Sequence, residues 1–291
     1  MGKELKLYFL PESYVRMVNS IRIYNNPFNV PNEEREKLLI EAQKKEKVLY
    51  YTGCMASIRY KQIANLTAKV LSRLGYKFAM LKGNETCCGG FLSMLGLEDE
   101  FKKVAELNLK KIQESYAEKV ITTCPMCLKT MKHDYEEVGI KVPFEVTHVS
   151  EAIVDAIKKG LKFKSELKGI KALYHDPCHL GRACGIYEEP RDILSKIPGL
   201  TYLEIPFYNK KESLCCGGFL KPAFPSLATA ISEIMFSEAK KLDINSIITS
   251  CPTCLHNFLF LAPEFDLQVY DLVELVAVAL GIVKLEELKK F

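Results

Sequence analysis

The chain has 291 residues, of which 48% are hydrophobic and 26% charged, so it can bury the cores of about two domains and is not a disordered chain. Its formal net charge is only +4, and its basic residues alternate with acidic ones, which argues against a nucleic-acid partner. The eleven cysteines, in a chain without an export signal, argue against a disulfide scaffold and favour thiols kept reduced for metals or redox chemistry.

Residues 1–46 are expected to form an N-terminal arm or linker ahead of the first domain. The segment that follows Met1 carries lysines and a glutamate and then runs into polar sequence. It has neither the continuous apolar run nor the cleavage site of a secretory signal. We therefore expect a cytoplasmic protein.

Short apolar and aromatic runs predict the strands of two domains. Residues 48–51 and 119–122 provide them in a first domain spanning 47–165, and residues 172–174 and 246–249 in a second domain spanning 166–291. Helical patterns cover residues 63–74, 98–116 and 227–242. Alternating strands and helices predict an α/β protein of two pseudo-symmetric Rossmann-like βαβ domains with parallel sheets.

The most apolar segment lies near the C-terminus, at residues 272–283, and contains Glu274. It is much shorter than the roughly 20 residues that a membrane-spanning helix needs. We expect a buried helix here, so any attachment to a membrane would be made through a partner.

A cysteine pattern occurs twice in the same order. Each half has a single cysteine, then the sequence CCGGFL, then a CPxC motif preceded by Ile-Thr-Thr or Ile-Thr-Ser. The offset between equivalent cysteines is nearly constant along the repeat. Because open α/β sheets place ligands at the carboxyl ends of their strands, we expect the cysteine loops to lie there. The glycines after each CC pair are expected to let the backbone bend tightly.

The thiols of this repeat point to metal. Thiolate is a soft ligand that selects zinc or iron–sulfur clusters, and a CxxC at the end of a strand offers two sulfurs on one turn. Adjacent cysteines suit a cluster several ångströms across better than one tetrahedral ion. Structural zinc takes four ligands, whereas each half supplies five thiols. Structural zinc and buried unliganded thiols remain the competing interpretations.

The repeated motif, together with YTGC at 51–54 and HDPCHLGR at 175–182, resembles the cysteine-rich CCG-domain family, whose best-known members include heterodisulfide reductase catalytic subunits of the B and D type. The resemblance spans about residues 26–276. It implies two [4Fe–4S] clusters, non-cubane in type, that flank a disulfide substrate. The implied ligands are Cys54, Cys87, Cys88, Cys124 and Cys127 for one cluster, and Cys178, Cys215, Cys216, Cys251 and Cys254 for the other.

The resemblance also implies an oxidoreductase of anaerobic metabolism that reduces or forms disulfides by two-electron chemistry. Its alternative is a non-catalytic electron-transfer or docking subunit of a dehydrogenase or quinone-linked complex acting on succinate or fumarate, glycolate, lactate or glycerol-3-phosphate. In fused relatives a segment like residues 26–35 follows a ferredoxin-like module, and no CxxCxxC run precedes it here. We therefore expect a separate ferredoxin-like iron–sulfur partner, and a flavin or membrane protein as further candidates. The arm either docks that partner or packs on the first domain.

Candidate proton donors are His175, His179 and Lys82, although the two histidines are slightly better suited to capping or orienting the Cys178 loop. Cys184 falls outside the repeat and is expected to be a passive cysteine. The other histidines carry weaker expectations: His133 and His256 follow the CPxC motifs as surface or helix residues, and His148 shares a packing position with Asp271.

Overall fold

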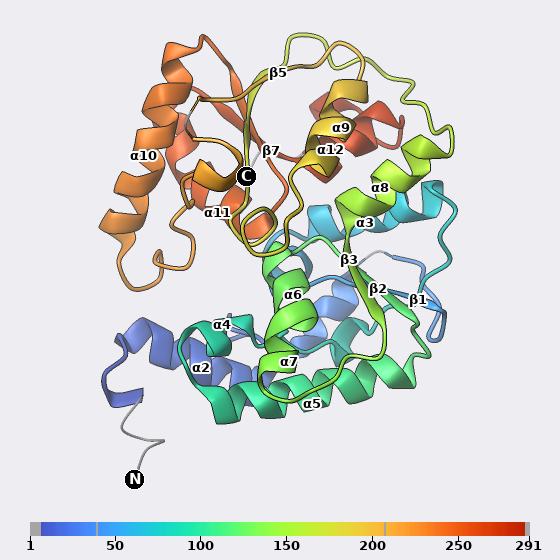
Figure 1. Ribbon diagram of the computed structural model, residues 1–291, viewed down its shortest axis with the longest axis vertical. Coiled ribbons are helices and arrows are strands. Elements are labelled where there is room, and N and C mark those ends of the chain that lie inside the picture. The colour runs from blue at the N-terminus through green and yellow to red at the C-terminus, as the bar shows by residue number, and fades with distance from the viewer. Residues whose placement is uncertain (1–6, 39, 207, 289–291) are drawn as a thin grey trace.

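The computed structural model describes residues 7–38, 40–206 and 208–288, and each half of the chain carries its own parallel sheet (Figure 1). The first sheet has the strand order β1-β2-β3, and the second has the order β5-β4-β6-β7. The strands are β1 (Val48–Tyr51), β2 (Lys119–Thr122), β3 (Glu145–His148), β4 (Lys171–His175), β5 (Thr201–Leu203), β6 (Ser246–Thr249) and β7 (Gln268–Asp271). This arrangement confirms the α/β class with parallel sheets.

The two sheets repeat one plan. In the first, Tyr51 lies opposite Thr122 and Thr122 opposite His148; in the second, Thr249 lies between His175 and Asp271. The pairs β1/β4, β2/β6 and β3/β7 are thus equivalent. Strand β5 has no full counterpart in the first sheet, where a parallel bridge between Leu49 and Ala79 takes its place. In each sheet the strands are parallel, so the loops that follow them all begin at one edge, the edge formed by the carboxyl ends of the strands.

Helices cover both sheets and separate the strands. The longest run along opposite ends of the molecule in Figure 1, α5 beneath the first half and α10 beside the second. The helices of the described chain are α2 (Glu12–Tyr24), α3 (Lys61–Arg73), α4 (Gly90–Met94), α5 (Glu98–Glu114), α6 (Pro125–Lys129), α7 (Tyr135–Glu137), α8 (Val149–Lys158), α9 (Glu188–Lys196), α10 (Pro225–Lys241), α11 (Pro252–Leu261) and α12 (Leu272–Ala279). Shorter turns are η1 (Asn32–Lys37), η2 (Met55–Arg59), η3 (Lys82–Asn84), η4 (Thr130–Asp134), η5 (Lys210–Glu212), η6 (Ala262–Phe265) and η7 (Leu285–Glu287).

The predicted strands and helices are all present with small shifts at their ends. The apolar segment 272–283 forms a buried helix, α12, which ends earlier than expected because Gly281 turns the chain at φ +70°. In the part of the chain that the structure describes, no helix is both long enough and apolar enough to cross a membrane.

The two halves share one apolar core across their junction. Ile63 of α3 and Ile121 of β2 belong to the same buried cluster as Ile248 of β6 and Val276 of α12. Helix α3 of the first half packs on α12 of the second, and α8 of the first half packs on α9 of the second. Such a continuous core makes the two halves interdependent.

The N-terminal arm contributes to both halves. In α2, Tyr14 and Val18 are buried. The Tyr14 ring lies 5.4 Å from the rings of both Phe91 and Phe219, and its hydroxyl donates to the Phe219 carbonyl at 2.8 Å. Residues 1–6, part of the predicted arm, lie outside the described residues. The described part of the arm therefore packs on the body of the protein.

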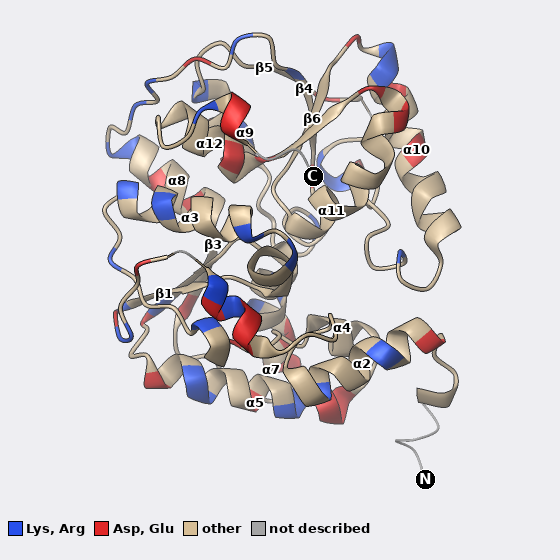
Figure 2. Ribbon diagram, turned by 180° about the vertical axis from the view of Figure 1, so that it is seen from behind, with Lys and Arg blue, Asp and Glu red and all other residues tan. Residues whose placement is uncertain are grey.

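Charged segments of both signs are interspersed over the surface helices in Figure 2. This distribution agrees with the small net charge. Some carboxyls are buried instead. Two of these, Asp271 and Glu274, form a capping box at the start of α12, and Glu274 accepts a hydrogen bond from Gln62 of α3 at 2.7 Å. Burial raises the pKa of Asp271 to about 8 and that of Glu274 to about 7.

These raised pKa values predict that stability falls with rising pH. The folded protein binds the two protons more tightly than the unfolded chain, so the free energy of unfolding should decrease from about pH 4 to about pH 8. Asp271→Asn keeps a cap acceptor without the charge, and it should flatten this decrease. Denaturant titrations at a series of pH values measure it. Asp266→Asn, an exposed site nearby, is the control and should leave the slope unchanged. An equal slope in all three proteins would contradict the expectation.

Candidate functional site

The ten repeated cysteines gather into two thiol groups at the carboxyl ends of the strands. Cys54 follows β1, and Cys124 follows β2 just before α6. Cys178 follows β4, and Cys251 precedes α11 after β6. Pro125 and Pro252 begin the two helices, where a missing N–H costs nothing, so both CPxC motifs hold their second cysteine on a first helical turn. The sequence-predicted position of the cysteine loops is thus observed.

The first thiol group consists of Cys54, Cys87, Cys88, Cys124 and Cys127, and all five side chains are buried. The thiols lie one beside the next in the order Cys54, Cys87, Cys88, Cys127 and Cys124. These contacts act on acidity: the Cys127 and Cys87 thiols lower the pKa of Cys88 to about 6, whereas its Cys87 neighbour and burial raise that of Cys54.

The second thiol group has the same order of contacts, Cys178, Cys215, Cys216, Cys254 and Cys251. Its exposure differs, because Cys215 is exposed and Cys178 is half-buried. Contacts with Cys178 and Cys216 hold the pKa of Cys215 far below its usual range, and contact with Cys254 lowers that of Cys251. The two groups therefore share a plan while one is enclosed and the other partly open.

The glycines after each CC pair allow two close approaches. Gly89 (φ +86°) and Gly217 (φ +75°) adopt a backbone conformation that favours glycine. A Cβ on Gly90 would lie 2.8 Å from Met126 Cγ, and one on Gly218 would lie 2.7 Å from Thr253 Cγ2. Each CCGG loop thus packs against the middle of the CPxC motif in its own half.

Backbone amides of the same loops point at sulfur. The N–H groups of Gly89 and Gly90 donate to the sulfurs of Cys87 at 3.4 Å and of Cys88 at 3.5 Å. In the second half, Gly217 and Gly218 donate to Cys215 at 3.4 Å and to Cys216 at 3.3 Å. Such donors stabilise anionic sulfur.

A cavity of about 270 Å³ lies over the first thiol group. All five of its cysteines line this cavity, whose other walls include Phe28, Phe91 and Met126. The opposite side comes from the cysteine loops of the second half, with Gly218, Phe219, Lys221, Pro222, Thr253 and His256. The cavity is mainly apolar and lies where the two repeats meet.

His256 lines this cavity, although the sequence predicts only a surface or helix residue. It lies on α11 as expected, and its Nδ1 is 2.6 Å from the hydroxyl of Tyr60, which comes from the first half. Burial lowers the pKa of His256 to about 4, which keeps the ring neutral at pH 7. No spacing in the sequence relates the two residues, because the contact crosses the junction of the halves.

Of the predicted proton donors, none lines the cavity among the described residues. His175 ends β4, buried 4.8 Å from the Phe258 ring, and burial lowers its pKa to about 4. His179 is half-buried, and Cys215 acts on the charge of both histidines. Lys82 lies in η3, ahead of the first CC pair. The histidines thus adjoin the second thiol group, and the roles of all three residues stay predictions.

Cys184 stands apart from both thiol groups. It is half-buried, and burial raises its pKa to about 11. The charges that act on it include Lys132 and Glu151 of the first half, with no thiol among the principal ones. These surroundings agree with a passive cysteine.

His148 lies beside both CPxC loops. Its Nδ1 accepts the N–H of Ser150 at 3.2 Å, so its Nε2 carries the proton and lies 3.2 Å from the Thr123 carbonyl. Burial lowers the pKa of His148 to about 4, although the nearby Thr123 and Ser250 backbone groups act to raise it. A neutral imidazole thereby holds the residue before Cys124 and lies near the residue before Cys251. Asp271, its counterpart, caps α12, as His148 caps α8.

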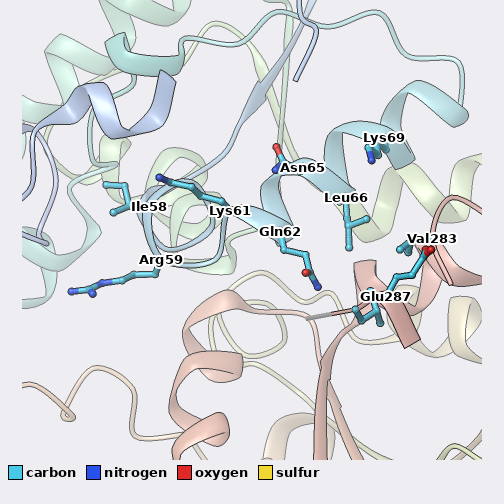
Figure 3. Close-up of a pocket in the computed structure, with 10 residues that line it drawn as sticks. Ile58, Arg59, Lys61, Gln62, Asn65, Leu66, Lys69, Val283 and Glu287 are labelled. Atoms are coloured by element: carbon cyan, nitrogen blue, oxygen red, sulfur yellow. The ribbon is translucent and has the colours of Figure 1, made fainter. Parts of the chain in front are cut away.

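A second pocket, of about 420 Å³, lies elsewhere on the junction (Figure 3). Its walls come from η2 and α3, with Arg59, Lys61 and Lys69, and from the segment after α12, with Val283 and Glu287. None of its lining residues is a cysteine. This pocket is therefore separate from the thiol groups.

The donor set fits an iron–sulfur group. Each half offers five soft sulfurs in mutual contact with backbone N–H groups directed at two of them, which are features that sulfur-ligated iron uses. Among the described residues, no three His, Cys, Asp or Glu side chains converge as a single metal ion requires. Five sulfurs exceed the four ligands of a tetrahedral ion and suit a group of several irons.

Comparison with known proteins agrees with the cysteine pattern. The profile of the family described as CCG, cysteine-rich domain, matches residues 48–132 and 172–259. The chain is 35% identical to the D subunit of the dihydromethanophenazine:CoB–CoM heterodisulfide reductase of Methanosarcina mazei, over 89% of this chain and 66% of the relative. It is 32% identical to the B subunit of the fumarate reductase (CoM/CoB) of Methanothermobacter marburgensis, over 79% of this chain and 46% of the relative. The chain thus spans at most about two thirds of these relatives.

A solved structure shares the fold at low sequence identity. The crystal structure of a hypothetical protein from Helicobacter pylori superposes with a TM-score of 0.52 and 10% identity, over 92% of this chain and 57% of the other. This similarity concerns the fold alone and agrees with the two Rossmann-like halves.

The close approach at Gly217 gives a stability prediction. A Cβ there would lie 2.9 Å from the Cα and carbonyl oxygen of Ala228, whereas one on Gly160 (φ +98°) meets nothing within 4 Å. Gly160→Ala should cost about 1–2 kcal/mol of unfolding free energy for its left-handed backbone alone. Gly217→Ala should cost about 1–3 kcal/mol more, because backbone must move. Denaturant unfolding measures both, and equal losses would show that the close approach is unimportant.

Proposed function

This chain belongs to the CCG family of cysteine-rich domain proteins, and we propose from this premise that it is an iron–sulfur subunit of a heterodisulfide reductase-like oxidoreductase. The reaction is a two-electron reduction or formation of a disulfide held between its two halves. One observation carries the proposal: the loops that carry the second thiol group form one wall of the cavity that meets all five sulfurs of the first. Both halves of the chain therefore meet next to the first thiol group.

The cofactors of this proposal are two [4Fe–4S] clusters of non-cubane type. The first would be held by Cys54, Cys87, Cys88, Cys124 and Cys127, and the second by Cys178, Cys215, Cys216, Cys251 and Cys254. Such clusters supply one-electron redox chemistry next to the substrate. Two of them match the two electrons that a disulfide takes up when it becomes a pair of thiols.

The residues of the chain then have separable tasks. The apolar walls formed by Phe28, Phe91 and Phe219 exclude water from the cavity. His256, held by Tyr60, presents a neutral imidazole from the opposite wall, and Lys221 adds a positive charge there. Phe219 follows the CCGG sequence of the second group, and Thr253 stands between Cys251 and Cys254. A substrate that touches these two residues is therefore near both thiol groups. His175, His179 and Lys82 are retained as proposed proton donors.

The alternative function is an electron-transfer or docking subunit. The exposed Cys215 favours a role of this kind for the second thiol group, because an open sulfur site is where a redox partner would exchange electrons. The two proposals are compatible if electrons enter through the second group and are used at the cavity. A ferredoxin-like iron–sulfur protein is the proposed partner, and a flavin or membrane protein would follow it in the same complex.

The remaining expectations belong to the same proposal. Residues 47–165 and 166–291 would form the two cysteine-rich domains, with residues 1–46 as arm. Thiol-ligated clusters need a reducing compartment, which supports a cytoplasmic location in which a partner makes any membrane attachment.

The cofactor proposal predicts about eight iron and eight acid-labile sulfide per chain in anaerobically purified protein. Cys87→Ser removes a central member of the first thiol group and should lower both contents by about half. Cys184→Ser is the matched control, because Cys184 lies outside both groups, and it should keep the full content. Zinc without sulfide would refute the proposal.

The catalytic and the conduit roles differ in their response to a blocked cavity. Lys221→Trp places a bulky ring at the cavity wall, and Lys241→Trp places the same ring on the far end of α10. In dithionite-reduced protein, Lys221→Trp should slow reoxidation by a small disulfide at least about tenfold, while iron content and reoxidation by a one-electron dye stay normal. Lys241→Trp should behave as the unmodified protein. Equal disulfide rates in all three would favour the conduit role.

A further inference from the structure

Arg35 is a fully buried guanidinium that touches a thiol of the first group. Its side chain has 0% exposure, and its Nη2 donates to Cys54 Sγ at 3.1 Å. Its Nη1 donates to Glu85 at 2.5 Å and to the Ser57 hydroxyl at 2.6 Å, and its Nε donates to Asn32 at 3.0 Å. All three nitrogens of the guanidinium therefore donate hydrogen bonds, and one of them donates to sulfur.

Glu85 balances this charge and fixes the loop that carries Cys54. It is also fully buried, and it accepts the backbone N–H groups of Thr52 and Gly53 at 2.9 Å each, as well as the Thr52 hydroxyl. Burying an ion pair is costly unless every donor and acceptor is satisfied. Here the pair is satisfied in part by the sulfur of Cys54, so the pair and the thiol group are built together.

The second half also has a buried arginine, which binds Asp176 two residues before Cys178, but this arginine is used differently. Arg191 donates to Asp176 with both terminal nitrogens, at 2.9 Å and 2.7 Å. The same nitrogens also reach the Tyr187 carbonyl and Glu204. Within the described residues, the structure gives Arg191 only oxygen acceptors. The two thiol groups therefore differ in a charged contact as well as in exposure.

We propose that Arg35 sets the reduction potential of the first iron–sulfur site above the value it would have without the Arg35 contact to Cys54. The proposal deepens the function proposed above and rests on it. A cationic donor stabilises sulfur most when sulfur carries most negative charge, which is the reduced state. Hydrogen bonds to ligand sulfurs are one of the means by which proteins tune such potentials. Arg35 is a positioning and tuning residue, because it acts through Cys54.

The alternative is that Arg35 only neutralises the charge of Glu85. The variant Arg35→Lys distinguishes this role from the tuning of a reduction potential. A lysine keeps the positive charge for Glu85, but its single ammonium lacks the fork that reaches Glu85 and Cys54 from opposite nitrogens. A purely structural role would change the unfolding free energy and leave potentials alone. A tuning role moves one potential.

The first experiment is an EPR-monitored redox titration of the anaerobically purified full chain. Arg35→Lys should shift the midpoint potential of one of two signals to a more negative value and leave the other unchanged. Arg191→Lys is the matched control and should leave the signal that responds to Arg35 unchanged. Iron and sulfide are measured on the same samples. Full iron content with unshifted midpoints in Arg35→Lys would overturn the proposal and leave the proposed cofactors intact.

The second experiment needs no variant that could fail to fold. The unmodified chain is labelled with arginine carrying ¹⁵N in its guanidinium, and pulsed EPR is recorded on the reduced protein. A weak ¹⁵N coupling should be seen on one of the two signals. Iron-loaded protein without any coupling would overturn the inference alone. Protein without iron and sulfide would overturn both the inference and the proposed function.

Discussion

The constraint on which the structure depends is that five thiols from three distant segments must meet at one point in each half. Parallel strands solve most of this problem, because β1 and β2, or β4 and β6, deliver their following loops to the same edge. The CC pair comes from neither strand and must be brought in by a loop. Glycines make that approach possible, since Gly217, at positive φ, packs directly on α10 backbone and Gly218 packs on the CPxC motif. The two halves are thus alike where sulfur positions are set.

The halves differ where the surroundings of sulfur are set. The first thiol group is enclosed under α2 and the cavity and has a guanidinium on Cys54. The second group has an exposed cysteine, Cys215, and the buried arginine of that half, Arg191, donates to carboxylates. Burial, charge and hydrogen bonding are the properties that alter the energetics of a sulfur-ligated centre. The two halves thus share one scaffold and differ in the burial and the charged contacts of their thiols. Such a difference suits two centres that perform different steps of one electron transfer.

Sequence reasoning reached the elements whose signals are local. The strands before Cys54 and Cys124 are short apolar runs, and α12 is a continuous apolar segment, so periodicity and composition were sufficient to predict them. The repeat also placed the cysteine loops correctly. The contacts of Arg35 with Cys54, of Tyr60 with His256 and of His148 with Ser250 were beyond reach. Each joins segments whose separation carries no periodic signal, and Arg35 lies in a stretch of charged residues that looks like solvated surface until folded.

These long-range contacts argue that the site is a property of both halves. His148 holds the Thr123 carbonyl before Cys124 and lies near Ser250, the residue before Cys251 in the other half. The cavity takes its thiols from one half and its opposite wall from the other. Helices α3 and α8 each pack on the other half, so separating the halves would expose buried apolar surface to water and cost free energy. A single half would keep five cysteines in the right order and lose one wall of the cavity next to them. The duplication therefore provides that wall as well as a second set of thiols.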